Sequence, residues 1–167
     1  MKSYQQVIIR IDGECKIIDF IIKRALHAWN EGSKQPDMQN VFLDSVAFNL
    51  HGFYTGIERL FELIARYIDG ELPSGKDWHV ALLNQISNHY KDQRPAVISS
   101  STKLKLDEFR RFRQIVRNVY TISLAPEKMK TMMANLPDLW KQLVAELHAF
   151  SVFLDDVIKT NEKRSGH

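Results

Sequence analysis

The sequence predicts an all-α protein folded as an up-and-down bundle of about five helices. Two observations support this fold class. Apolar residues recur three and four positions apart along most of the chain, and the alternation typical of β-strands is scarce. The 7 Gly and 5 Pro residues are few, and they mark the ends of segments long enough to be helices. With 167 residues, 44% of them hydrophobic, the chain can form one domain with its own core, which we expect over residues 1–160, followed by a disordered tail at 161–167.

The first two predicted helices are long and are expected to pack antiparallel. The first spans about residues 3–31, because an apolar series that begins at Val7 continues along one side of it, and Gly32 and Pro36 mark its end. The second begins near Pro36 and carries apolar residues every three or four positions. It stops at the loop 70–75, whose two Gly and one Pro are typical of turns.

Three further helices are expected after this loop. A shorter one spans residues 77–90 and is ended by the Arg-Pro pair at Pro95. The next spans about residues 104–122 and follows three consecutive serines that are able to cap it. The last begins at Pro126, which suits the first turn of a helix, and Pro137 is expected to kink that helix or split it in two.

The second predicted helix contains two glycines and a row of polar residues. Gly52 and Gly56 each cost roughly 1 kcal/mol relative to alanine inside a helix, so we expect another helix to approach closely there. His51, Tyr54 and Glu58 share one face of the same helix, at spacings i, i+3 and i+7. This face is either a polar seam that lines a site or core packing with satisfied hydrogen bonds, and the second interpretation is favoured.

Charge and cysteine content limit the class of protein. The chain carries 23 Lys and Arg against 20 Asp and Glu, a net charge of +3 that is too small to indicate nucleic-acid binding by itself. The single Cys15 excludes an internal disulfide and indicates a reducing compartment, so the expected location is the cytoplasm. No stretch of about 18 uncharged apolar residues occurs, which excludes a membrane span. The N-terminus also lacks the apolar run of a signal peptide.

Metal and cofactor binding are not indicated by the sequence. The histidines are scattered, with no His-Glu-x-x-His motif and no paired cysteines. A di-iron site in a helical bundle would need Glu-x-x-His on two helices, and the nearest approach, Glu146-Leu147-His148, has the wrong spacing. We therefore expect neither a metal nor a cofactor. The six histidines are His27, His51, His79, His89, His148 and His167.

The most informative segment is 109–120, in which four arginines are threaded through apolar residues. On a helix, Arg113, Arg117 and Tyr120 fall within about 60° of one another, so two cations and a phenol share one stripe. The four arginines are Arg110, Arg111, Arg113 and Arg117.

This arginine stripe has two interpretations. It is a solvated helix face whose arginines pair with Asp107 and Glu108, or it binds phosphate or the RNA backbone. The second interpretation rests on the planar guanidinium, whose forked donors match the oxygens of a phosphate group. Composition and spacing leave both interpretations open.

The second half of the segment reads Arg113-Gln114-Ile115-Val116-Arg117-Asn118-Val119-Tyr120, an R-x4-N-x-Y pattern. It resembles the R-x4-H-x-Y signature of HEPN-domain proteins of the HepT type, with Asn118 at the position of the family's histidine. The pattern lies late in an all-helical chain, as it does in that family. The segments HGFYTGIERLFELIARYIDGELPSGKDWHVALL and RPAVI also resemble a HepT-like subgroup, so the resemblance covers roughly residues 40–155.

The resemblance implies a HEPN-like helical bundle that forms a homodimer, with the two motifs facing each other across the two-fold axis. Active members of the family are metal-independent ribonucleases. In toxin–antitoxin pairs their partner is a small MNT-type nucleotidyltransferase that adenylylates the motif tyrosine. The function that the resemblance implies is therefore a toxin-type ribonuclease, acting through attack by the RNA 2′-hydroxyl and paired with such an antitoxin.

The resemblance also assigns roles by position. Arg113, Asn118 and Tyr120 take the catalytic positions. Arg113 would bind the scissile phosphate and stabilise the charge that develops in the transition state. Tyr120 would position RNA or receive the nucleotide, and Arg110 and Arg117 would add contacts to RNA or phosphate.

Because asparagine stands at the position of the family's histidine, Asn118 leaves two hypotheses about activity. Cleavage without a metal needs a group that accepts the proton of the 2′-hydroxyl, and an imidazole does so whereas an amide does not at physiological pH. Either another histidine serves as the base, or the chain is a non-catalytic HEPN module that binds nucleotide, RNA or a partner protein. The candidate bases are His51, His79 and His89.

Overall fold

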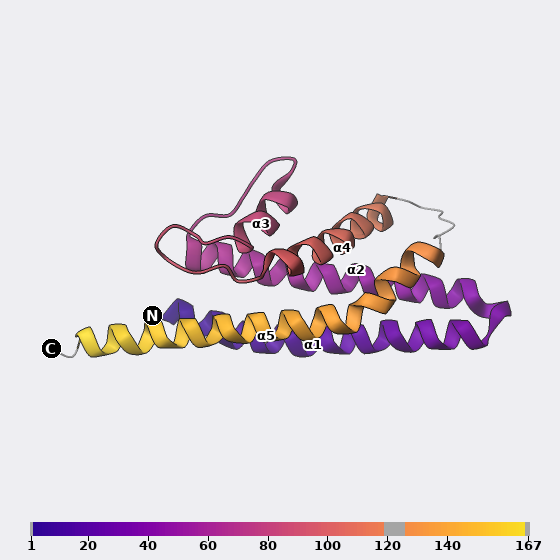
Figure 1. Ribbon diagram of the computed structural model, residues 1–167, viewed down its shortest axis with the longest axis horizontal. Helices are drawn as coiled ribbons and strands as arrows, with labels where there is room; N and C mark the ends of the chain where they lie inside the picture. Colours follow the sequence, from indigo (N-terminus) through magenta and orange to yellow (C-terminus); the bar gives the residue numbers. More distant parts are fainter. Residues whose placement is uncertain (1, 119–125, 166–167) are drawn as a thin grey trace.

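The computed structural model describes residues 2–118 and 126–165, and over these residues it contains five α-helices and no β-strand (Figure 1). The all-α fold class is confirmed. A 3₁₀ turn, η1, leads into the second helix, and a π-helical turn, η2, follows it. In chain order the elements are α1 (Lys2–Lys34), η1 (Pro36–Met38), α2 (Gln39–Ile64), η2 (Ala65–Asp69), α3 (Trp78–Ile86), α4 (Ser100–Asn118) and α5 (Pro126–Ser165).

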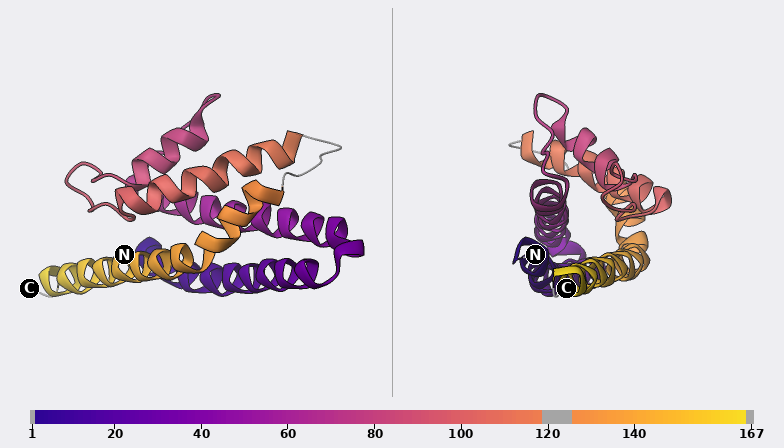
Figure 2. Two further views of the ribbon diagram at one scale, coloured as in Figure 1. Left: turned by 45° about the vertical axis from the view of Figure 1, so that its right-hand side comes forward. Right: turned by 90° about the vertical axis from the view of Figure 1, so that its left-hand side faces the viewer.

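The long helices α1 and α2 form an antiparallel hairpin, as predicted, and the other helices pack on it. Seen end-on in Figure 2, α1 and α5 lie side by side, α2 and α4 lie above them, and α3 is outermost. Phe53 of α2 meets the ring of Phe109 of α4 at 5.1 Å and that of Trp140 of α5 at 6.3 Å, both edge-on. Three helices therefore converge on the fully buried Phe53.

The close approach predicted for the second helix occurs where α1 crosses α2. A Cβ atom at Gly56 would lie 2.8 Å from Cγ1 of Ile18, which is too close for any side chain. Gly52 faces Ile21 at 3.7 Å, an ordinary van der Waals distance. A side chain at position 56 would therefore force Ile18 to move, whereas the space at position 52 would accept a methyl group.

A buried ion pair anchors the connection between α3 and α4. Arg94 donates from Nε and Nη2 to the two carboxylate oxygens of Asp69, at 2.6 and 2.7 Å, and neither side chain is exposed. Gln85 donates to the same carboxylate at 2.7 Å. Because Asp69 ends η2, the pair holds the segment 87–99 against the end of the second long helix. The sequence analysis did not foresee this contact.

The same arginine explains why α3 is shorter than predicted. The helix ends at Ile86 rather than at residue 90. The carbonyl of Gln85 accepts a hydrogen bond from Arg94 at 3.2 Å, and the carbonyl of Ile86 accepts the backbone N–H of Val97 at 2.9 Å. These two carbonyls at the end of α3 thus accept donors from outside the helix.

The ends of the last two helices also differ from the predicted ones. α4 begins at Ser100, four residues early, because the side chain of Ser99 accepts the backbone N–H of Thr102 at 3.2 Å, the serine cap that the sequence predicted. Predicted helical residues 119–122 lie outside the described residues. α5 is one helix that contains Pro137, and Figure 1 shows its bend in the orange part of the ribbon. It continues to Ser165, so residues 161–165 are helical where a disordered tail was expected.

Candidate functional site

The polar face of α2 is covered by α4. The two helices lie side by side and run in opposite directions (Figure 1), so later turns of α4 meet earlier turns of α2. Side chains on a helix lean toward its N-terminus. Arg113 accordingly reaches back along α4 toward Glu58. The charge of Arg117, one turn further along α4, acts on His51, which lies on an earlier turn of α2.

Arg113 forms a buried ion pair with Glu58. Its Nη1 donates to Oε1 of Glu58, and the two side chains are only 14% and 5% exposed. The guanidinium carbon also lies 5.9 Å from the ring centroid of Tyr54, where the negative face of the ring attracts the cation. The solvated-face interpretation is therefore wrong for Arg113, which is held in place between two helices.

Glu58 also binds a histidine from a third helix. Nδ1 of His79, at the start of α3, lies 2.5 Å from Oε2 of Glu58, and the His79 side chain is 15% exposed. One carboxylate thus joins α2, α3 and α4 through its two oxygens. The favoured interpretation of the polar face, core packing with satisfied hydrogen bonds, is confirmed for Glu58.

The ion pair leaves part of the Arg113 guanidinium unused. This group has five N–H donors in a fixed plane. Glu58 accepts from Nη1, whereas the buried Nε has no acceptor among the described residues. A buried donor without an acceptor is costly, so an anionic oxygen that reached this edge would gain a charge-assisted hydrogen bond.

Two further groups lie next to Arg113. Arg117 is exposed and makes no ion pair with another described residue. His51 is half-buried, and its pKa is lowered first by burial and then by the positive charges of Arg113 and Arg117. The imidazole is therefore neutral at pH 7, although two cations lie near it.

The other two arginines of the stripe are engaged elsewhere. Arg110 and Arg111 both contact Asp107, at 2.6 and 2.7 Å. The predicted pairing with Asp107 is thus confirmed for these two arginines. Glu108 makes no ion pair within the described ranges, 2–118 and 126–165, so that part of the prediction is wrong there.

The structure places some of the predicted site residues and not others. It places Arg113 and brings Arg117 and His51 beside it. Arg110 is directed to Asp107 instead. Asn118 is the last residue of α4, but its side chain falls outside the described parts of the chain, as does Tyr120.

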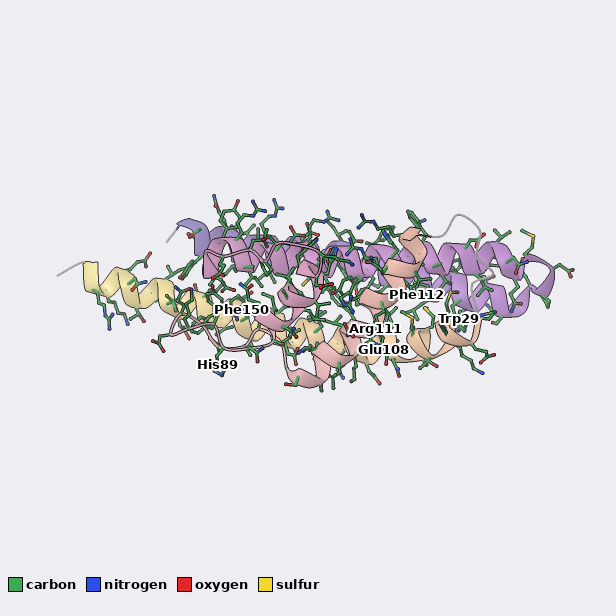
Figure 3. All side chains as sticks on the ribbon, turned by 90° about the horizontal axis from the view of Figure 1, so that it is seen from above. Trp29, His89, Glu108, Arg111, Phe112 and Phe150 are labelled. Carbon is green, nitrogen blue, oxygen red and sulfur yellow. The ribbon has the colours of Figure 1, made fainter. Side chains whose placement is uncertain are left out.

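The remaining candidate groups lie away from this site. His89 is exposed in the connection after α3, and Figure 3 shows it well apart from Phe112 of α4. Cys15, on α1, has its pKa raised to about 11 by burial and by the nearby Asp12 and Glu14, so its thiol is unreactive at neutral pH. In the described ranges, no three His, Cys, Asp or Glu side chains converge where they could hold a metal ion. None of the described helices has the length and apolar character needed to cross a membrane.

Sequence reasoning missed the partner of Arg113. Glu58 was recognised as part of a polar face, but the arginine that meets it lies 55 residues later in the chain. A signal was present in the sequence: one amphipathic helix carries an acidic residue on its inward face, and another carries a band of arginines that could pair with it. His79, which completes the cluster, follows no pattern that a sequence would reveal.

The fold and the site define an all-α protein whose fourth helix presents a partly buried basic cluster against the second. The family model for HepT-like proteins matches residues 45–154, and the chain belongs to this family. The match extends from α2 into α5 and includes His51, Glu58, His79, Arg113 and Arg117. No curated protein and no solved structure matches the chain.

Proposed function

We propose that this HepT-like protein is a toxin-type, metal-independent ribonuclease. The observation that carries the proposal is the position of Arg113: Glu58 and Tyr54 orient its guanidinium, and a donor edge remains without an acceptor. Arg117 beside it supplies a positive charge that no described carboxylate neutralises. Such a pair of guanidiniums suits a phosphodiester and its transition state better than it suits a metal cation.

The partners in this proposal come from family membership and from the motif. We propose a homodimer whose partner is an MNT-type nucleotidyltransferase, with Tyr120 as the residue that receives the nucleotide. A nucleotide on Tyr120 would add bulk and negative charge next to the arginine stripe and so block RNA. Incubation with such an enzyme and ATP is expected to raise the intact mass by whole adenylyl groups, and an unchanged mass would contradict this part.

A second candidate function is favoured by one observation. Glu58 neutralises the charge of Arg113, and Asn118 stands where the family's histidine would be. The first feature weakens the stabilisation of a charged transition state, and the second removes the general base. Neither prevents Arg117 from contacting a backbone phosphate. The second candidate is therefore a non-catalytic module that binds nucleotide, RNA or a partner protein.

RNA cleavage in EDTA tests the proposal directly. The informative variant is Arg117→Ala, because this exposed side chain has no described partner whose loss would disturb the fold. Arg111→Ala is the matched control, since Arg111 is also exposed on α4 but lies about 160° around the helix from Arg113. We expect Arg117→Ala to slow cleavage about a hundredfold and Arg111→Ala to leave the rate within about twofold of wild type.

Two outcomes would overturn this assignment. Folded wild-type protein that binds RNA without cleaving it would favour the non-catalytic module. Equal rates for the Arg117 and Arg111 variants would show that cleavage occurs away from the Glu58–Arg113 pair.

A further inference from the structure

The ribonuclease proposed above lacks a general base at the motif position, because Asn118 stands there. An amide does not accept the proton of a 2′-hydroxyl at neutral pH. If the site cleaves RNA, one of its other groups must do so. The inference below rests on the proposed function and names that group.

We propose that His51 is the general base of this site. It lies on the face of α2 that α4 covers, one turn before Tyr54 and two turns before Glu58. α4 runs antiparallel to α2 (Figure 1), and the charges of two of its arginines, Arg113 and Arg117, act on His51. His51 therefore shares a face of α2 with Tyr54 and Glu58, the two residues that contact the Arg113 guanidinium.

The other described histidines do not fit this role. Nδ1 of His79 is bound to Glu58, and the ring is largely buried behind the ion pair. His89 is exposed but distant from α4, as Figure 3 shows. His148 lines a groove of about 380 Å³ between α1 and α5, and His27 lies on the exposed side of α1.

The environment of His51 suits proton acceptance. Among the described groups, the charges that act on it are those of Arg113 and Arg117 of α4. Together with burial, they hold its pKa below the ordinary histidine value of 6.5, so the ring is neutral at pH 7. A neutral imidazole can accept a proton, and the same two cations are placed to balance negative charge on the phosphate.

The reaction needs no further reactant than water. His51 takes the proton of a ribose 2′-hydroxyl, and the 2′ oxygen forms a bond to the adjacent phosphorus. The bond from phosphorus to the 5′ oxygen of the next nucleotide breaks, and that oxygen takes a proton from water. The imidazolium returns its proton to the hydroxide that remains, and the products are a 2′,3′-cyclic phosphate and a 5′-hydroxyl.

The test compares His51→Gln with His89→Gln, a matched control that changes an exposed histidine outside the site. Each protein, shown by intact mass to be unmodified, is assayed on a single-stranded RNA in EDTA between pH 5 and 8. Binding is measured separately by fluorescence anisotropy, with an oligonucleotide of 2′-deoxy sugars that cannot be cleaved.

We expect His51→Gln to bind the deoxy probe as wild type does and to cleave RNA about 10²–10⁴-fold more slowly. In wild type the rate should rise with pH along an acid limb centred below pH 6.5, because the base is active only when neutral, and the variant should lack this limb. Added imidazole should restore part of the rate of a His51→Ala variant, which separates a chemical role from a structural one.

Failure of this inference is distinguishable from failure of the proposed function. Cleavage by His51→Gln at the wild-type rate, with an unchanged pH profile, would overturn the assignment of His51 and leave the ribonuclease intact. Wild-type protein that cleaves no RNA would overturn the ribonuclease, and with it the need for a base.

Discussion

At the scale of single residues, the described ranges of the chain contain two buried arginine–carboxylate pairs that differ in one respect. Arg94 directs Nε and Nη2 to Asp69 and Nη1 to two backbone carbonyls, so its donors are used. Arg113 leaves its Nε without an acceptor among the described residues. The Arg94–Asp69 pair therefore has a structural role in the connection between α3 and α4. The Arg113–Glu58 pair keeps an unused donor and is the better place for a ligand.

Glu58→Gln tests how firmly the Arg113 pair supports the fold. The substitution keeps the shape of the side chain but leaves a buried guanidinium and His79 without their carboxylate. Removing one partner of a buried pair costs about 3 kcal/mol or more, because the other charge stays buried and uncompensated. We expect the free energy of unfolding in urea to fall by about that amount.

Asp107→Asn is the control for this prediction. Asp107 also contacts two arginines, but its side chain is 22% exposed and one of the arginines is 72% exposed. Water screens these pairs, so a loss of about 1 kcal/mol or less is expected. If the two variants lost equal free energy of unfolding, burial would not make the Glu58 pair more stabilising than the Asp107 pairs.

At the scale of helices, the α1–α2 hairpin includes a close contact at Gly56. Gly56→Ala would gain about 1 kcal/mol in helix propensity, but its Cβ would meet Ile18 at 2.8 Å. The side chain of Ile18 is fully buried, and protein interiors are close-packed, so moving it is costly. We expect a net loss of about 1–3 kcal/mol in the free energy of unfolding, measured by urea denaturation.

Gly13→Ala provides the comparison on the other helix of the hairpin. No atom lies within 4 Å of a Cβ built at Gly13, so the propensity gain has nothing to offset it. This variant should be more stable than wild type by up to about 1 kcal/mol. A Gly56→Ala protein as stable as the Gly13→Ala protein would show that the two helices can move apart at little cost.

The helices were more predictable than the contacts between them. Their apolar spacing is local, so α1 and α2 could be inferred within a few residues. Pro126 marked the start of α5, and the serine before α4 was recognised as a cap. The ion pair of Glu58 with Arg113 joins residues 55 positions apart and depends on how α4 crosses α2. The end of α3 depends on Arg94, which acts from outside the helix. Local pattern carries no information about such contacts.

At the scale of the whole molecule, the α1–α2 hairpin exposes large apolar side chains. Phe48 of α2 is 70% exposed and lies about one turn before His51, and Phe20 of α1 is 61% exposed. A two-fold axis at Phe48 would bury this side chain against its symmetry copy and bring the two His51 residues, each one helical turn away, near each other. The proposed homodimer therefore has a defined candidate surface on the α1–α2 hairpin.

Phe48→Ser tests this surface, with size-exclusion chromatography and light scattering as the measurement. Each dimer would lose two buried phenylalanines, at about 1.5–3 kcal/mol each, so the dimer should dissociate at concentrations where wild type stays paired. Leu104→Ser is the control, because Leu104 is also 70% exposed but lies about 180° around α4 from Arg113. We expect the Leu104 variant to remain dimeric. A monomeric wild type, or equal masses for the two variants, would remove this face as the dimer interface and leave each site to act within one chain.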